Sequence, residues 1–170
     1  MPYQSATEIG AGPRHFAFTP GGGQAFVINE LNSTISSYAY DPAKGNLTHQ
    51  ATRSTLPSRY LGNNSCADIH VHPNGKFVYG SNRGHDTIVC FAIGENGELT
   101  LVGHTPTGGN FPRNFSISPG GNHLLVANQN GNNMLSFRIN RSTGELTKLS
   151  ETRVMTPVCI EFVDEMEPVE

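Results

Sequence analysis

The feature of this sequence that most constrains its fold is an internal repeat. Three segments open alike: PRHFAFTP at residues 13–20, ADIHVHP at residues 67–73 and PRNFSISP at residues 112–119. Their closing prolines, Pro20, Pro73 and Pro119, are separated by 53 and 46 residues (73 minus 20 and 119 minus 73). A fixed period of about 40 to 50 residues is typical of solenoids and β-propellers, in which each repeat is one small structural unit.

Each repeat has the pattern of four short strands. A glycine-containing turn and an apolar run follow each proline, which predicts a β-hairpin. These apolar runs lie at residues 25–28, 77–79 and 124–126. A third strand with alternating apolar residues follows, and a Gly-x-Leu-Thr turn leads from it into a fourth, more polar strand. The predicted fold class is therefore all-β, a β-propeller of four-stranded blades, and no segment has a convincing helical apolar period.

The 170 residues hold only part of a propeller, which we interpret as a single partial domain over residues 1–170. Three whole units cover about 13–57, 66–107 and 112–154, and part-blade strands are predicted at 4–10 and 156–163. An open arc of blades exposes strand edges and apolar faces. We expect a homo-oligomer or a missing half of the propeller to cover them, unless the chain is an unstable fragment.

Charge and composition exclude several kinds of partner. The formal net charge is −3, so the chain lacks the basic field that binds nucleic acid, and an anionic small molecule needs a local basic site. We see no signal peptide near Met1 and no segment long enough to span a membrane, which predicts a cytoplasmic protein without a membrane partner. Three cysteines without a CxxC spacing argue against a disulfide framework and a zinc site.

Four motifs together resemble the lactonase family of seven-bladed propellers, which includes 6-phosphogluconolactonases and carboxymuconate-lactonizing enzymes. They are GPRHFAFTP at 12–20, VINELN at 27–32, ADIHVHPNGKFVYGSNR at 67–83 and FPRNFSISPGGNHLLVANQN at 111–130. The resemblance runs over nearly the whole chain and corresponds to the C-terminal half of such a propeller. It implies hydrolysis of a sugar lactone such as 6-phosphogluconolactone, an activity of carbohydrate metabolism and the pentose phosphate pathway that requires no metal or organic cofactor.

The resemblance also implies a site at one mouth of the central channel, made of a histidine, two arginines and a glutamate. The arginine of the GPRH motif corresponds to Arg14, the glutamate of the NEL motif to Glu30, and the arginine after the second strand of the next blade to Arg83. These three are the predicted catalytic residues. The family's histidine belongs to the preceding blade, whose first strand this sequence lacks, so the match is to three residues of four.

The chemistry of the residues agrees with this role. Glu30, Arg83 and Gln129 each lie ten residues after the proline of their repeat, so equivalent strands bring them to one ring. A carboxylate flanked by arginines could orient water for attack on a lactone carbonyl, while an arginine stabilises the oxyanion or holds a phosphate or carboxylate. The alternative interpretation is that Glu30 and Arg83 form an inter-blade ion pair that fixes packing.

A second set of polar residues lies at the blade starts. His15, Asp68 and Asn114 align with one another, which predicts a hydrogen-bonding ring on the channel wall. The substrate-binding residues that we predict are His15, Asp68, His70, Arg113 and Gln129. The ladder of Asp68, His70 and His72 has the alternation of metal ligands on a strand, but we favour hydrogen-bonded structural roles for it and predict no metal. The aromatic residues at the blade starts, Phe16, Phe18, Phe115 and Phe162, are predicted to be core.

Two alternatives to a lactonase stay open at this point. The first is a non-catalytic propeller fragment that acts as a scaffold or binding module, which the absent histidine-bearing blade favours. The second is carboxymuconate cyclisation, because the sequence does not separate a phosphate ligand from a carboxylate ligand in an anion-binding channel.

Overall fold

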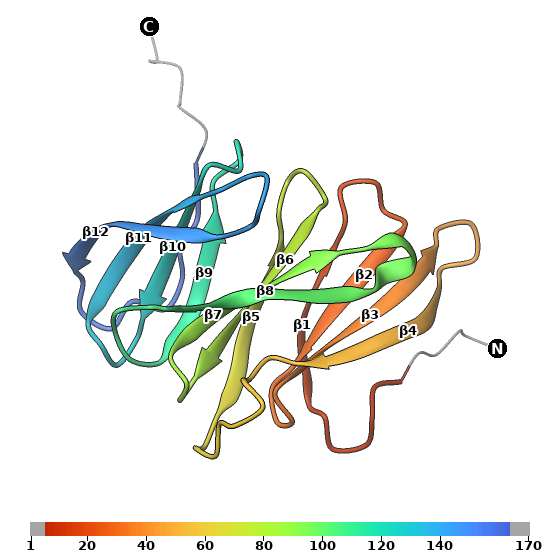
Figure 1. Cartoon of the computed structure of the whole chain (residues 1–170), viewed down its shortest axis with the longest axis horizontal. Coiled ribbons are helices and arrows are strands. Elements are labelled where there is room, and N and C mark those ends of the chain that lie inside the picture. Colours follow the sequence, from red (N-terminus) through yellow and green to blue (C-terminus); the bar gives the residue numbers. More distant parts are fainter. Residues whose placement is uncertain (1–5, 164–170) are drawn as a thin grey trace, which may run out of the picture.

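The computed structural model describes residues 6–163 and contains three four-stranded antiparallel sheets (Figure 1). The first blade comprises β1 (Pro13–Phe18), β2 (Gln24–Asn29), β3 (Thr34–Asp41) and β4 (Asn46–Ser54). The middle blade comprises β5 (Ser65–Val71), β6 (Phe77–Arg83), β7 (Thr87–Ile93) and β8 (Leu99–Pro106). The last blade comprises β9 (Pro112–Ile117), β10 (His123–Asn128), β11 (Asn133–Ile139) and β12 (Leu146–Arg153).

Within each blade, strands that are consecutive in sequence are neighbours in space, so each blade is an up-and-down meander. The predicted all-β fold of four-stranded repeats is confirmed. The helical content of residues 6–163 is one 3-10 turn, η1 (Glu95–Gly97). No helix in this part of the chain has the length and apolar character that crossing a membrane requires.

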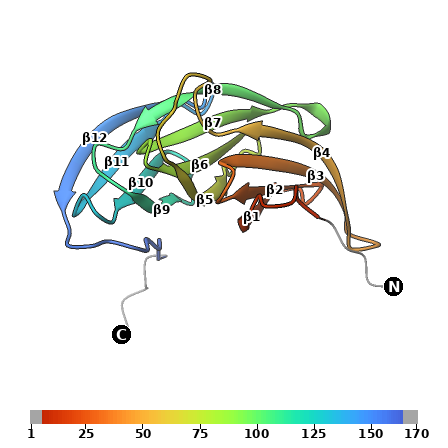
Figure 2. The same cartoon turned by 90° about the horizontal axis from the view of Figure 1, so that it is seen from below.

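The blades are arranged as a fan. Figure 2 shows the first strands, β1, β5 and β9, on the concave side of the arc and the fourth strands, β4, β8 and β12, on the convex side. The first strands also contact one another from blade to blade, β1 against β5 and β5 against β9. Residues at equivalent positions of the three first strands therefore line one continuous inner wall.

Two apolar layers hold the three blades together. One lies between the first and middle blades and contains Phe26, Ile28 and Val78, and the other lies between the middle and last blades and contains Tyr79 and Phe137. Because successive residues of a strand point to opposite faces, β6 sends Val78 to one layer and Tyr79 to the other. All seven residues of β6 are consequently buried.

The outward face of the first blade corrects one prediction. Phe115 is fully buried as expected, but Phe16 and Phe18 are 67% and 41% exposed. These two rings face away from the middle blade, and no strand of the described residues covers them. They border a groove of about 440 Å³ that Val27 and Tyr38 also line. An aromatic residue at a blade start is thus core only where another blade packs against it.

The described residues of the two predicted part-blade strands form no strand. Gln4 and Ser5 lie outside the described residues, and residues 6–12 and 154–163 contain no strand. A fourth strand pairs with the third strand of its own blade and a first strand pairs with the second, and the sequence contains neither partner. The C-terminal segment nevertheless lies against the inner wall, because the Ile160 N–H donates to Asn114 Oδ1 at 2.7 Å.

A repeated polar joint complements the apolar layers. Thr107, at the end of the middle blade, has its carbonyl oxygen 3.0 Å from Asn128 Nδ2 of the last blade, which donates to it. Thr55 and Asn82 make the same contact between the first and middle blades at 2.9 Å. All four residues are fully buried. Each joint therefore satisfies a carbonyl group that water cannot reach.

We expect Asn128→Ala to lower the free energy of unfolding by about 2 kcal/mol, because it leaves the buried Thr107 carbonyl without a donor. The matched control is Asn29→Ala, the equivalent position in the first blade. Within residues 6–163 Asn29 donates to Thr34 and Ser36 of its own blade, and both hydroxyls keep other partners. Asn29→Ala should lower the free energy of unfolding by about 1 kcal/mol or less. Urea unfolding of the two variants measures this difference. Equal decreases in the free energy of unfolding would contradict a stabilising role of the Asn128–Thr107 hydrogen bond.

Candidate functional site

The three predicted catalytic residues meet at the joint between the first and middle blades. Glu30 directly follows β2, Arg14 lies in β1, and Arg83 is the last residue of β6. Arg14 Nε lies 3.4 Å from Glu30 Oε2, and Arg83 Nη2 donates to Glu30 Oε1. The prediction that equivalent strand ends converge is confirmed for Glu30 and Arg83. Their contact is also the inter-blade ion pair of the alternative interpretation.

Arg83 is held on several sides. Its side chain is 6% exposed, and Nη2 also donates to the Cys66 carbonyl oxygen at 2.8 Å. The guanidinium carbon lies 4.9 Å from the centre of the Phe111 ring, a cation–π distance. Phe111 has a φ of 62°, in the left-handed region that glycine favours, and the equivalent Gly12 has a φ of 67°. The backbone strain at Phe111 places an aromatic ring against the arginine, which sequence reasoning missed.

Asp68 is the centre of a second polar cluster on the inner wall. Its Oδ1 lies 2.8 Å from His15 Nδ1 of the first blade. Its Oδ2 accepts from Asn114 Nδ2 of the last blade at 2.6 Å and lies 3.3 Å from His70 Nε2. The backbone N–H groups of Ile69 and Phe115 donate to the same carboxylate. The predicted ring of His15, Asp68 and Asn114 is therefore a set of direct contacts, centred on the middle blade.

These neighbours keep the Asp68 carboxyl group ionised. Burial by itself raises the pKa of a carboxyl group, because it disfavours the charged form. Here the hydrogen bond and charge of His70, the hydrogen bond of His15 and the backbone N–H of Phe115 together outweigh burial and lower the pKa of Asp68 to about 2. The carboxylate thus stays available as an acceptor over the physiological pH range.

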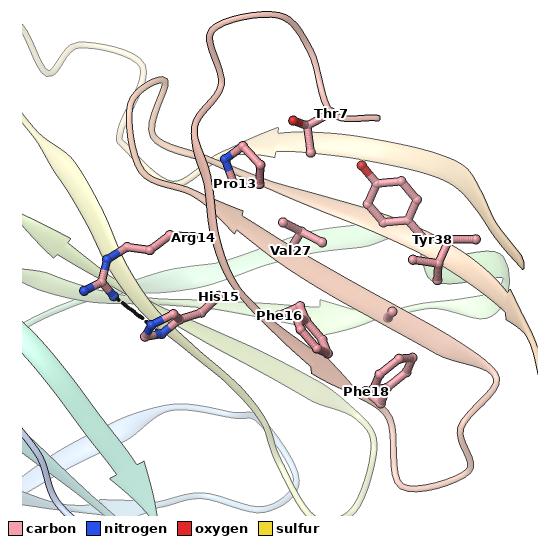
Figure 3. A pocket seen from close by; sticks show the side chains of 10 residues that line it. Thr7, Pro13, Arg14, His15, Phe16, Phe18, Val27 and Tyr38 are labelled. Atoms are coloured by element: carbon pink, nitrogen blue, oxygen red, sulfur yellow. Dashed lines mark hydrogen bonds between the residues drawn. The ribbon is translucent and has the colours of Figure 1, made fainter. Parts of the chain in front are cut away.

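Arg14 connects the two clusters. Its Nη1 donates to the carbonyl oxygen of Ala67 at 2.6 Å and lies 3.2 Å from His15 Nε2. Figure 3 shows the Arg14 guanidinium and the His15 ring side by side, turned away from Phe16 and Phe18. Burial lowers the pKa of Arg14, and the charge of Arg83 lowers it further. Contacts therefore run without a break from Arg83 through Arg14 to Asp68.

Two predicted substrate-binding residues stand apart from this network. Arg113 is half-buried in β9 and makes no hydrogen bond or ion pair within residues 6–163, although its charge contributes to lowering the pKa of Arg14. Gln129 pairs its backbone N–H with the Phe111 carbonyl at 3.0 Å. Its side-chain Oε1 is buried and has no hydrogen-bond partner among the described residues.

The two histidines of the predicted ladder, His70 and His72, have different roles. His70 contacts Asp68, whereas His72 is fully buried and fixed at both ring nitrogens. Its Nδ1 accepts from the Asn74 N–H at 3.0 Å, so Nε2 carries the proton and donates to the Gly121 carbonyl oxygen at 2.8 Å. His72 therefore fastens the middle blade to the last. Within residues 6–163 no group of three or more histidine, cysteine or acidic side chains is placed to hold a metal ion.

Three radial meanders around a charged inner wall define this structure as part of a β-propeller. A family model described as "Lactonase, 7-bladed beta-propeller" matches residues 2–162, and the chain belongs to this family.

Curated relatives support the same assignment. The chain is 47% identical over 149 residues to a protein of Formosa agariphila named 6-phosphogluconolactonase, a match over 86% of this chain and 41% of the relative. It is 37% identical over 159 residues to a 6-phosphogluconolactonase of Bacillus subtilis, over 92% of this chain and 46% of the relative. The chain therefore spans about half the length of the curated relatives it matches.

Solved structures agree with the fold. A Lactobacillus plantarum protein superimposes with a TM-score of 0.91 at 37% identity, over 94% of this chain and 47% of the other. A periplasmic gluconolactonase of Pseudomonas aeruginosa superimposes with a TM-score of 0.88 at 31% identity, over 94% of this chain and 45% of the other.

The Asp68 cluster predicts a specific acid sensitivity. Because the folded-state pKa of Asp68, about 2, lies below the unfolded value of about 3.9, its stabilisation is complete above about pH 4 and is lost as the pH falls toward 2. The two values differ by about two units, or roughly 2.5 kcal/mol. The stability advantage of the wild type over Asp68→Asn should therefore shrink by about 2 kcal/mol between pH 5 and pH 2.

Chemical unfolding at a series of pH values measures this advantage. The control is Asp41→Asn, which removes a carboxylate that is 41% exposed at the surface of the same blade as His15. Curves for Asp68→Asn and the wild type that stay parallel down to pH 2 would show that the cluster does not hold Asp68 in its ionised form.

Proposed function

We propose that this chain supplies an anion-binding hydrolytic site for a sugar lactone such as 6-phosphogluconolactone. One observation carries the proposal: Arg14 of β1 and Arg113 of β9 lie on the concave wall of a chain whose formal net charge is −3, and the charge of the buried Arg83 also acts on Arg14. Glu30 is the carboxylate that pairs with two of them. The names of the Formosa and Bacillus relatives support a phosphorylated lactone, and the Pseudomonas structure supports a lactone ring as the shared feature.

The arginines divide into two roles on this proposal: Arg113 holds the phosphate, and Arg14, beside Glu30 and His15, acts at the lactone carbonyl. Arg14 and Arg113 occupy the same position in the first and last blades, and the middle blade has the uncharged Ala67 between them. A phosphate at Arg113 therefore meets no competing side-chain carboxylate at the intervening position, and guanidinium groups match phosphate oxygens with paired donors. Arg113 is the stronger candidate for the phosphate, since no protein group within residues 6–163 occupies it.

Two of the predicted site residues also carry a buried polar atom without a partner within residues 6–163, Arg83 Nε and Gln129 Oε1. A buried polar atom without a partner costs about 1–3 kcal/mol, which a ligand can recover by supplying the missing acceptor and donor. A sugar lactone carries both kinds of group. The hydrolysis itself needs water, a base and oxyanion donors, so we propose no cofactor.

A non-catalytic role is the second candidate, and the Glu30 geometry favours it. Both carboxylate oxygens of Glu30 already contact guanidinium groups, as in a purely structural ion pair. Since the chain spans about half of its relatives, the lactonase proposal requires that further blades, from a longer polypeptide or a second copy, complete the channel.

We expect Arg113→Gln to raise the KM for 6-phosphogluconolactone about tenfold or more, because a hydrogen bond to a charged group is worth about 1.5–3 kcal/mol. The KM for unphosphorylated gluconolactone should not change. The exposed Arg59→Gln serves as the control. Hydrolysis is measured on each oligomeric species after separation by mass, with carboxymuconate as a competing substrate class.

Three outcomes of this assay are informative. Loss of the phosphate preference in Arg113→Gln supports the proposal. Turnover of carboxymuconate alone would show that the substrate is a carboxymuconate and not a sugar lactone. Absence of turnover in every species would leave the non-catalytic role.

A further inference from the structure

The surroundings of His15 fix which of its ring nitrogens carries the proton. Nδ1 lies 2.8 Å from Asp68 Oδ1, an ionised carboxylate that can only accept, so Nδ1 is the donor. Arg14 Nη1 lies 3.2 Å from Nε2 and 3.4 Å from Nδ1. Because these two distances are nearly equal, Nη1 does not lie on the lone-pair axis of Nε2. The Asp68 carboxylate therefore selects the tautomer, and the neutral ring has its proton on Nδ1 and its lone pair on Nε2.

His15 is also the most exposed member of the network. Its side chain is 46% exposed, compared with 37% for His70, 34% for Glu30 and 6% for both Asp68 and Arg83. Glu30 has both oxygens engaged by arginines, which leaves it poorly placed to take a proton from water. Among the residues of this network, His15 therefore combines the greatest exposure with a ring nitrogen, Nε2, that carries no proton in the neutral form.

We propose that His15 is the general base of this site and that Asp68 is its positioning residue. The inference rests on the proposed lactone hydrolysis for the reaction that it serves. His15 Nε2 takes a proton from water as the water oxygen bonds to the lactone carbonyl carbon. The bond between that carbon and the ring oxygen then breaks, and His15 returns the proton to the ring oxygen. Lactone and water thus give one hydroxy acid, and His15 is regenerated.

The neighbours of His15 suit this step. Arg14 Nη1, close to Nε2, can donate to the oxyanion that forms on the carbonyl oxygen, so the base and the oxyanion donor lie side by side. Asp68 is itself fixed by the Asn114 side chain and by the backbone N–H groups of Ile69 and Phe115. The carboxylate that orients the ring therefore belongs to the middle blade and is anchored by the last.

Imidazole rescue tests the catalytic role directly. His15→Gly should lower kcat for lactone hydrolysis by about 100-fold or more, the usual contribution of a general base, and added imidazole should restore part of it. Because His15 is half exposed, the cavity that the variant leaves is open to imidazole. His123→Gly, at an exposed position of the last blade, is the matched control and should neither lose activity nor respond to imidazole. A loss of activity in His15→Gly that imidazole does not restore would overturn the role of base.

Asp68→Asn separates positioning from binding. We expect it to lower kcat with little change in KM, because the ring loses its fixed tautomer and not its substrate contacts. Imidazole should not rescue this variant, since His15 still fills the site. An unchanged kcat in folded Asp68→Asn would overturn the positioning role.

Two measurements that need no lactone keep this inference distinct from the proposed function. Nitrogen-15 NMR of the histidine side chains should show the neutral His15 ring protonated at Nδ1 in the wild type, and a mixture of tautomers in Asp68→Asn. Diethyl pyrocarbonate should modify His15 faster than the fully buried His72, with mass spectrometry locating the adduct. If the chain hydrolyses no lactone, the proposed function fails. If His15 is protonated at Nε2 or is no more reactive than His72, the inference fails whatever the activity.

Discussion

The packing of one blade's first strand against the next is the constraint on which the rest of this structure depends. Glu30 meets Arg83 across the joint between the first and middle blades, and His15 meets Asp68 across the same joint. Asn114 reaches Asp68 across the following one. None of these contacts exists within a single blade. The buried layers on both faces of β6 set the distance between blades, and the charged wall exists only because that distance is short.

The outer face of the first blade shows that apolar residues stay exposed where no further blade packs against them. The middle blade is buried on both sides, while Phe16 and Phe18 of the first blade are open to solvent beside an apolar groove. An apolar surface of this kind is usually covered by another protein surface. The chain spans about half of its curated relatives, and this face is where the preceding blade of a seven-bladed propeller would pack. A blade packed against this face would cover Phe16 and Phe18 and would also extend the inner wall.

Much of the architecture follows from sequence, because turn glycines, prolines and strand alternation are local signals that recur in each repeat. The convergence of Glu30 and Arg83 was predictable for the same reason, as equivalent positions of adjacent blades lie close together. Whether Phe16 is buried depends on a neighbouring blade and not on its own strand, so the repeat pattern gave the wrong answer. The contact of Phe111 with Arg83 depends on a left-handed backbone at a non-glycine residue, and only its alignment with Gly12 hinted at it. The choice of Asp68 as the centre of the polar ring follows from tertiary geometry that alignment of the repeats does not contain.

We propose that the inner wall built by β1, β5 and β9 binds a phosphorylated sugar acid or its lactone. The most direct measurement is an NMR titration of the labelled chain with 6-phosphogluconate, the stable hydrolysis product, beside a titration with gluconate. We expect 6-phosphogluconate to shift resonances of Arg14, His15, Arg113 and Phe111, and gluconate to bind more weakly at the same residues. Shifts confined to the groove beside Phe16 and Phe18, or none on the inner wall, would contradict it.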